Sequence, residues 1–485
     1  MTTMRLAWFS PFPPVRTGIA AVSDELVHAL ERRGFTIDRY PAEAAHDFPW
    51  RHRQRSYDLV VYQFGNSSHH DYEWAYALRY PGLVVLHDTH LHHARAAFLL
   101  RERRAADYRA EFIRNHPDVP ADAAELGVAG FDSVLYYQWP MVRGLVVASR
   151  LVAVHGDATR RALMESLSIP NFTTPNSQLT PNSQAGNSQG DLIDRIVSIR
   201  LGHGQLVTPD QRAEARRRIR ARYGISDDAV VFICAGGITP EKRISQTLAA
   251  LRATLAQAPS ARLMLAGATA AHYDVRADIS ALGLNDYVIA TGYLDSDAEL
   301  TDHLAAADVS LNLRWPTAGE TSGPWLRALG AGIATVITDL AHLGDVPSLD
   351  PRTWKMNGLW ALGFGLLEEE TELSESSGSV GPVTSVLKPK AQSPQPVCVA
   401  IDILDEDHSL RLAMRRLATD ADLRATLGRA GQEFWGHEHS LERMVEDYER
   451  VIGAVPEITP TPYVHEAGDE TLEALLAPFG VAKPW

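Results

Sequence analysis

The residues with the most chemical content lie in one stretch, 314–324, which reads RWPTAGETSGP. It separates an apolar run from a helical pattern that begins near Pro324. A turn of glycine and small hydroxyl residues at a helix N-terminus offers backbone N–H groups that suit a pyrophosphate, and a neighbouring carboxylate can bind sugar hydroxyls. We therefore predict a phosphate and sugar site made by Arg314, Gly319, Glu320, Thr321, Ser322 and Gly323. The alternative is a structural turn with proline in the first helical turn.

A second turn, 235–243, reads AGGITPEKR and again follows an apolar run and precedes a helical pattern. Glycine lets the backbone approach a ligand closely. Two cations beside it would neutralise a diphosphate leaving group without a metal. Taken with the first turn, this pattern predicts that Gly237, Lys242 and Arg243 bind the same diphosphate.

Histidines gather where two earlier apolar runs end, at 63–70 (QFGNSSHH) and 84–93 (VVLHDTHLHH). Three interpretations of the second stretch stay open: a metal site that uses His87, Asp88 and His90, a buried structural histidine, or a pair that lines a ligand cleft. We favour the cleft, to which we assign His87, Asp88, Asn66 and His70. The Asp-x-Asp pairs at 295–297 and 405–407 each precede a helical pattern, so we interpret them as helix caps. No metal or other cofactor is expected.

These residues are positioned by short apolar runs that alternate with amphipathic patterns, which is typical of βα units and parallel sheets. In the first 165 residues the runs are 6–9, 59–63, 83–86 and 144–154. From residue 229 the alternation restarts, with strands predicted at 229–235, 262–266, 287–291, 308–313 and 333–338 and helices at 244–257, 275–282, 297–305, 324–330, 410–417, 420–434 and 441–452. We predict an α/β protein with two doubly wound, Rossmann-like domains that face a cleft.

Composition limits the class of protein. With 485 residues, 45% hydrophobic and 22% charged, the chain is long enough for two folded domains. A net charge of −14 argues against a general nucleic-acid binder. Two cysteines and no run of 18 apolar residues predict a cytoplasmic protein without a membrane span. Arginines at 51–55 and 101–114 either lie on solvated helix faces, which we favour, or contact an anionic acceptor or the inner membrane surface peripherally.

The two turns, their order and spacing and the N-terminal loop around Gly18 resemble the group 1 glycosyltransferases, often called family 4, over residues 4–165 and 205–455. The resemblance implies the GT-B fold, a nucleotide sugar on the C-terminal domain, an acceptor on the N-terminal domain and transfer with retention, usually without a metal. It places Gly18 near the donor phosphates or acceptor, Lys242 in the diphosphate clamp, Glu320 to Gly323 at the donor sugar, and His87 near the anomeric carbon. Catalytic roles are accordingly expected for His87, Asp88 and Glu320.

The chain departs from the family's pattern of two glutamates eight positions apart. When Pro324 is aligned with the proline of that pattern, Gly319 and Arg327 occupy the glutamate positions, and G-E-T-S-G replaces the usual motif.

The domain boundaries that we predict are an acceptor domain at 1–170, a low-complexity insertion and linker at 171–204, a donor domain at 205–435 with a mobile insertion at 368–393, a returning helix at 436–455 and a tail at 456–485. The predicted function is sugar transfer from a nucleoside-diphosphate sugar to a polysaccharide or lipid-linked acceptor. The alternatives are a non-catalytic nucleotide-sugar-binding protein and a GT-B nucleotide-sugar epimerase.

Overall fold

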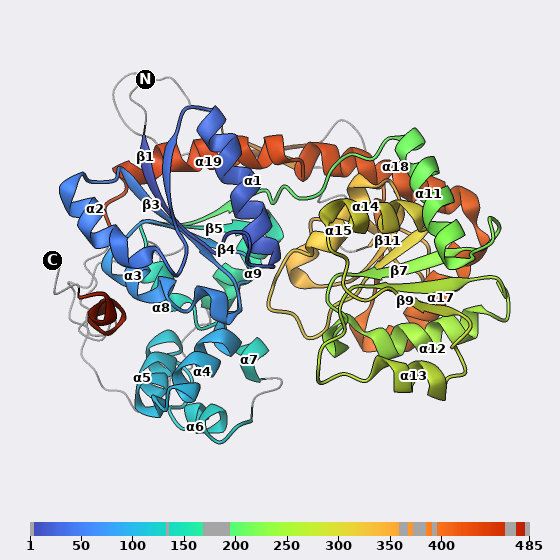
Figure 1. Ribbon diagram of the computed structural model, residues 1–485, viewed down its shortest axis with the longest axis horizontal. Helices are drawn as coiled ribbons and strands as arrows, with labels where there is room; N and C mark the ends of the chain where they lie inside the picture. The colour runs from blue at the N-terminus through green and yellow to red at the C-terminus, as the bar shows by residue number, and fades with distance from the viewer. Residues whose placement is uncertain are drawn as a thin grey trace. The chain divides into compact units, whose positions relative to one another are not determined.

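The computed structural model describes residues 4–131, 135–167, 195–357, 367–371, 385–389, 395–460 and 472–480. The chain forms two compact units, both drawn in Figure 1. Unit 1 comprises residues 1–203, 316–321 and 439–485, and unit 2 comprises residues 204–315 and 322–438. The short segment 316–321, which carries Glu320, therefore belongs to unit 1 although its neighbours in sequence belong to unit 2.

Unit 1 is built on a six-stranded sheet in the order β2-β1-β3-β4-β5-β6, and every pair of strands is parallel. The strands inside the sheet are nearly continuous apolar runs because helices cover both faces of a parallel sheet, whereas the edge strand β2 reads TIDRY. Their bounds are β1 Arg5–Phe9, β2 Thr36–Tyr40, β3 Leu59–Phe64, β4 Leu83–Leu86, β5 Leu151–His155 and β6 Ile196–Ile199.

The helices of unit 1 come from both ends of the chain. The last long helix, α19, packs beside α1, and its Tyr448 stacks on the buried Trp8 of β1 with ring centroids 5.8 Å apart. The helices are α1 Gly18–Arg32, α2 Phe48–Gln54, α3 Glu73–Arg79, α4 His92–Arg101, α5 Ala105–Asn115, α6 Ala123–Val128, α7 Leu135–Gln138, α8 Arg143–Ala148, α9 Asp157–Leu167 and α19 Leu441–Ala454, with 3-10 turns η1 Ala45–Asp47, η2 Ser68–His70, η7 Val455–Glu457 and η8 Ala477–Phe479.

Unit 2 is built on a seven-stranded parallel sheet in the order β12-β15-β11-β10-β7-β8-β9. Alternate residues of β7 face two different cores. Phe232 and Cys234 join a cluster with α12, α13 and α17, whereas Val231 and Ile233 join one with α11 and α14. Figure 1 shows these groups of helices on opposite sides of the sheet.

The strands of unit 2 are β7 Val231–Ala235, β8 Arg262–Ala266, β9 Val288–Ala290, β10 Val309–Asn312, β11 Ala334–Thr338, β12 Ser348–Leu349 and β15 Cys398–Ile401. Its helices are α11 Pro209–Tyr223, α12 Ile244–Thr254, α13 Val275–Ala281, α14 Asp297–Ala306, α15 Gly323–Gly330, α17 Glu406–Thr419 and α18 Ala421–Glu438, with 3-10 turns η3 Pro240–Lys242, η4 Ala341–Leu343 and η6 Ile403–Asp405. The α/β class and the two Rossmann-like sheets predicted from the sequence are confirmed.

The predicted insertions fall partly outside the described residues. Most of the polar stretch 171–204, namely 171–194, lies outside them, and its last part contributes β6 to the sheet of unit 1. Of the insertion 368–393, the structure describes one antiparallel pair, β13 Leu367–Thr371 with β14 Ser385–Pro389. Apart from these two strands, the insertion that we predicted to be mobile lies outside the described residues.

A buried ion pair fixes α11 to the sheet of unit 2. The Arg220 side chain, in a residue only 2% exposed, donates to Asp308 Oδ2 at 2.7 Å and to the carbonyls of Ser226 and Ala229 at 2.9 and 2.8 Å. Asp308 Oδ2 also accepts from the Val231 backbone N–H at 2.7 Å. The buried guanidinium of Arg220 therefore has the Asp308 carboxylate as its counter-ion.

We expect Asp308→Ala to lower the free energy of unfolding by about 3–5 kcal/mol, because it leaves a buried charge without its counter-ion. Urea unfolding followed by circular dichroism measures the change. The control is Asp302→Ala, which removes a solvent-exposed pair with Arg218 and should have a much smaller effect. Equal losses in the two variants would contradict the argument.

Candidate functional site

The two turns predicted to bind phosphate meet in unit 2, at the carboxyl end of β7. Gly236 has φ +83°, and a Cβ atom placed on it would lie 2.9 Å from Lys242 Nζ and 3.2 Å from Pro324 Cγ. Residues that are more than 80 positions apart in the sequence therefore surround one glycine. A Cβ on Gly267, after β8, would lie 2.1 Å from the Gly236 carbonyl oxygen, so neither loop has room for a side chain at their contact.

Lys242 places its ammonium group at this strand end. Its Nζ donates to the Ala235 carbonyl, the last residue of β7, at 2.6 Å. Gly237 faces open space, since a Cβ atom placed on it would meet no heavy atom within 4 Å. The end of β7 thus presents a cation beside accessible backbone.

Helix α15 supplies the second half of the site. Ser322 caps the helix, and its Oγ accepts from the Trp325 N–H at 3.4 Å, while Gly323 and Pro324 form the first turn. The positive end of the helix dipole at this terminus attracts an anion. The ammonium of Lys242 and the start of α15 together can bind a diphosphate.

Arg243 has a different environment from Lys242. Its guanidinium forms two bonds to the Glu406 carboxylate at the start of α17, at 2.7 and 2.5 Å. That hydrogen bonding raises the pKa of Arg243. The side chain joins two helices, so the structure places Lys242, and not Arg243, at the meeting point of the turns.

Arg327, at the position where the family pattern has a glutamate, is 8% exposed and donates to Asp297 Oδ2 at 2.7 Å. Asp297 is the first residue of α14, and the cap of that helix is Ser296, whose Oγ accepts from the Glu299 N–H. The Asp-x-Asp pair at 295–297 therefore contributes one ion-pair partner and flanks the capping serine. In the other pair, Asp405 accepts from His408 Nδ1 at 3.0 Å.

In the segment Pro316–Thr321, the carboxylate of Glu320 accepts hydrogen bonds from residues of the same segment. Glu320 Oε2 accepts from Thr317 Oγ1 and from the Ala318 N–H, both at 2.8 Å. Gly319 has φ +75°, and a Cβ atom placed on it would lie 2.0 Å from Thr89 Oγ1 in the same unit. These contacts fix the shape of the loop. In unit 2, the backbone N–H of Arg314 donates to Thr338 Oγ1 at 3.0 Å.

Three of the residues assigned to a cleft in unit 1 surround Gly65. A Cβ there would lie 3.0 Å from His70 Nε2 and 3.3 Å from Asp88 Oδ2. Asp88 Oδ2 accepts from the Asn66 N–H at 2.7 Å, and Asn66 Oδ1 accepts from the Ala94 N–H at 2.9 Å. The ends of β3 and β4 are therefore joined through hydrogen bonds that these side chains make to the protein.

His87 belongs to a chain of polar side chains behind these strand ends. Its Nε2 lies 2.7 Å from Gln63 Oε1, and its Nδ1 lies 3.1 Å from His155 Nε2. Tyr448 of α19 is 3.3 Å from the same Gln63 oxygen. Because both ring nitrogens of His87 have protein partners, its side chain acts here as a structural link. Burial lowers the pKa of His87 to about 3, so the ring is neutral.

His70 makes a buried pair with Glu73, at 2.9 Å between Nδ1 and Oε1. Burial lowers the pKa of His70 to about 3 and raises the pKa of Glu73 well above its usual value. Sequence reasoning missed Gln63, Glu73, His155 and Tyr448. Gln63 and His155, polar residues at the ends of otherwise apolar strands, were the available signal.

Gly18 opens α1, and a Cβ atom placed on it would have no neighbour within 4 Å. Thr17 caps this helix by accepting from the Ala20 N–H at 3.1 Å. The start of α1 is therefore a second exposed helix N-terminus, now in unit 1. Within the described ranges, no group of three or more His, Cys, Asp and Glu side chains could hold a metal ion.

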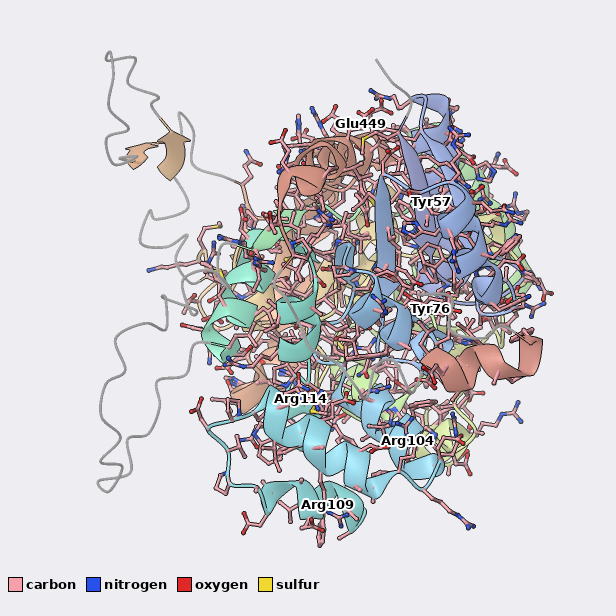
Figure 2. All side chains as sticks on the ribbon, turned by 90° about the vertical axis from the view of Figure 1, so that its left-hand side faces the viewer. Tyr57, Tyr76, Arg104, Arg109, Arg114 and Glu449 are labelled. Carbon is pink, nitrogen blue, oxygen red and sulfur yellow. The ribbon has the colours of Figure 1, made fainter. Side chains whose placement is uncertain are left out.

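The arginines of the 101–114 stretch are largely paired with carboxylates. Arg104 donates to Asp107 at 2.6 Å, and Arg109 forms two bonds to Glu125. Figure 2 shows Arg104, Arg109 and Arg114 along α5. From residue 92 to 131 the sequence has six arginines and six carboxylates, so the region has no net charge. In the described part of the chain, no helix has the length and apolarity that a membrane span requires.

Comparisons with known proteins agree with this picture. Residues 215–341 match the family model of glycosyl transferases group 1. A search of curated proteins found no match. Among solved structures, Anabaena Alr3699/HepE in complex with UDP and glucose has a TM-score of 0.54 at 12% identity, over 93% of this chain and 100% of that one.

Two further structures are similar. A glycosyltransferase from Rickettsia africae has a TM-score of 0.54 at 11% identity, over 95% of this chain and 100% of that one. The catalytic domain of starch synthase IV from Arabidopsis thaliana, bound to ADP and acarbose, has a TM-score of 0.55 at 11% identity, over 94% and 99%. These neighbours show the GT-B fold. Together with the family match, which includes Lys242 and α15, the fold supports a glycosyltransferase.

Proposed function

We propose that this protein transfers a sugar from a nucleoside-diphosphate sugar, bound by unit 2, to an acceptor bound by unit 1, with retention of the anomeric configuration and without a metal. The observation that carries the proposal is the meeting of Gly236, Lys242 and the start of α15 at one strand end. Solved structures with the same fold are complexes with UDP and with ADP. This supports the proposal that this chain also binds a nucleoside diphosphate.

In the proposed reaction, the diphosphate is the leaving group and gains negative charge as the bond to the sugar breaks. Lys242 and the positive end of the α15 dipole are fixed before the donor arrives, and such pre-oriented groups stabilise charge that develops in the transition state. The departing phosphate accepts the proton of the acceptor hydroxyl. The site of unit 2 thus supplies a cation where other transferases use a metal ion.

The acceptor is proposed to be a polysaccharide or a lipid-linked glycan. The segment 92–131 has no net charge and therefore little general attraction for anionic lipid. This does not favour a lipid-linked acceptor over a polysaccharide. A protein of the cytoplasm, with at most peripheral contact to the membrane, fits this proposal.

The test is a coupled assay on the purified chain. UDP, GDP and ADP sugars are incubated with and without an oligosaccharide acceptor, and released nucleotide and transferred sugar are both measured. Acceptor-dependent release with a retained anomer supports the proposal. Conversion of the donor without an acceptor would indicate the epimerase, and binding without release would indicate the non-catalytic protein.

Glu320→Gln tests the sugar-binding role predicted for the loop 316–321 of unit 1. The amide keeps an acceptor for the Ala318 N–H and so preserves the loop, but it weakens charge-assisted bonds to sugar hydroxyls. Because such bonds contribute roughly 1.5–3 kcal/mol, we expect kcat/KM to fall about 10- to 100-fold, while the thermal shift produced by the free nucleoside diphosphate is unchanged. An equal loss of nucleoside-diphosphate binding would contradict this role.

A further inference from the structure

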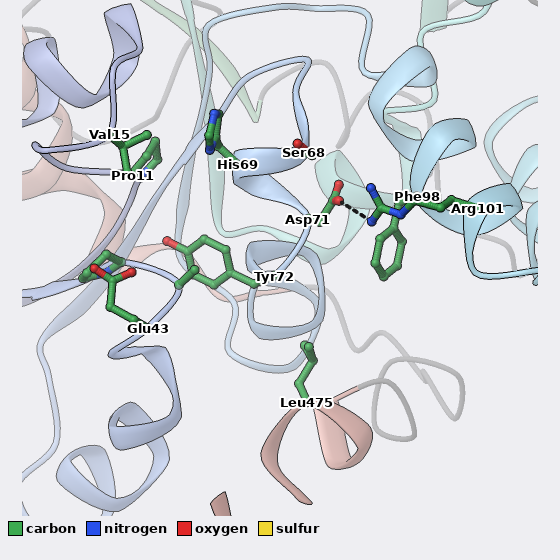
Figure 3. A pocket seen from close by; sticks show the side chains of 12 residues that line it. Pro11, Val15, Glu43, Ser68, His69, Asp71, Tyr72, Phe98, Arg101 and Leu475 are labelled. Carbon is green, nitrogen blue, oxygen red and sulfur yellow. Dashed lines mark ion pairs between the residues drawn. The ribbon is translucent and has the colours of Figure 1, made fainter. Parts of the chain in front are cut away.

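Unit 1 contains a pocket of about 310 Å³ that none of the predicted site residues lines. Its walls come from the loops after β1, β2 and β3, from α4 and from the C-terminal segment 472–480, and Figure 3 shows it from close by. Loops at the carboxyl ends of parallel strands are the usual place for ligands in α/β proteins. The volume is at the lower end of the range for small-molecule sites.

The pocket combines aromatic rings with carboxylates. Tyr72 and Phe98 contribute rings, and Glu43 and Asp71 contribute carboxylates. Aromatic faces and charged hydrogen-bond acceptors suit a sugar, whose ring has apolar C–H groups and whose hydroxyls donate hydrogen bonds. Two carboxylates against the single guanidinium of Arg101 leave the lining with a negative balance, which disfavours an anionic ligand.

Asp71 is a largely buried carboxylate on the pocket wall. Its side chain is only 15% exposed, and its Oδ2 forms an ion pair with Arg101 Nη2 at 3.6 Å. Burial outweighs the two nearby arginines and raises the pKa of Asp71 to about 6. Hydroxyl groups that donate to this carboxylate would replace the water that burial has removed.

The C-terminal segment is anchored in unit 1. Leu472 and Leu476 are fully buried in its core, and the ring of Phe479 stacks on His46 with centroids 3.9 Å apart. Leu475, between the two buried leucines, lines the pocket. The segment is therefore held firmly enough to serve as a wall.

We propose that this pocket binds a saccharide unit, uncharged or carrying an amino group, and that residues 472–480 form one wall of the site. The inference rests on the proposed function, since the saccharide is part of the acceptor. It favours a glycan acceptor over a phosphorylated one at this position, and it gives the C-terminal segment a role in acceptor specificity.

The test measures binding of glucose, galactose, mannose, glucosamine and glucuronate to the full chain by saturation-transfer NMR, with the nucleotide site filled by excess UDP. We expect at least one neutral or amino sugar to bind and glucuronate not to bind. Leu475→Trp, which fills the pocket, and the isosteric Asp71→Asn should each weaken binding at least tenfold, whereas Leu475→Met should not. Absence of binding by every sugar, or binding unchanged in both variants, would overturn the proposal.

UDP and ADP binding, measured on the same samples before saturation, separates the two proposals. Nucleotide binding without any sugar binding would overturn the pocket assignment alone. The opposite outcome is a protein that binds sugar, loses this binding in Leu475→Trp, and neither binds a nucleotide nor releases one from a sugar donor. This outcome would support the saccharide pocket and overturn the proposed transferase activity.

Discussion

Lys242→Ala is expected to lower kcat/KM for sugar transfer by about 10²- to 10³-fold, the usual cost of removing one pre-oriented group that stabilises a developing negative charge. Lys242 Nζ lies at the end of β7, held by the Ala235 carbonyl and next to Gly236. The diphosphate gains charge as the donor bond breaks, so the loss should appear mainly in kcat. Steady-state kinetics with the donor identified by the coupled assay give the two constants separately.

The matched control is Glu406→Gln, which disturbs the neighbouring cation instead. Glu406 holds Arg243 through two bonds, and its loss leaves a partly buried guanidinium without its counter-charge. We expect unfolding free energy to fall by about 2 kcal/mol, with kcat within roughly twofold of the unaltered protein. If Glu406→Gln abolished activity while Lys242→Ala retained it, the assignment of the two cations would be reversed.

The parallel sheets could be predicted because their central strands are apolar over nearly their whole length. The run that becomes β7, Val231–Ala235, is buried at every position, and its end is marked by glycines. The start of α15 was readable for a similar reason, since serine, glycine and proline in succession are typical of a capped helix start. Local patterns of this kind need no knowledge of the rest of the chain.

The environments of the charged and polar side chains could not be predicted in the same way, because their partners are remote in sequence. Glu406 is 163 positions from Arg243, and Tyr448 is 385 positions from Gln63. Nothing in the sequence around His87 indicates that its ring has two protein partners. Strands β2, β6, β12 and β15 were not predicted from the sequence. β2 reads TIDRY, and β6 has only four residues beside a long polar stretch, so both patterns are weak.

Acid is expected to unfold unit 1 steeply, because several of its histidines are buried in the neutral form. Burial lowers the pKa of His87 and of His92 from 6.5 to about 3. His92 is 1% exposed, and its Nε2 lies 2.9 Å from Tyr108 Oη. In the unfolded chain these rings bind protons below about pH 6.5, but in the folded chain they do not until the pH approaches 3.

The free energy of unfolding should therefore fall as the pH decreases from about 6.5, by about 1.4 kcal/mol per pH unit for each such histidine. Two histidines would account for roughly 5 kcal/mol between about pH 6.5 and 4.5, a large part of the 5–15 kcal/mol typical of a folded domain.

Urea unfolding at several pH values measures the slope, and His92→Gln tests its origin. The amide can keep the bond to Tyr108 but cannot bind a proton, so stability near pH 7 should change little while the slope decreases by about one proton. His28→Gln, at a side chain that is 53% exposed, is the control and should leave the slope as it is. If the slope of His92→Gln equalled that of the unaltered protein, the acid sensitivity would have to come from other groups. The direction of the pH effect distinguishes the two classes of buried group. Neutral histidines make the fold less stable in acid. A buried carboxyl such as Asp71, whose pKa is raised to about 6, makes the fold less stable as the pH rises through that value.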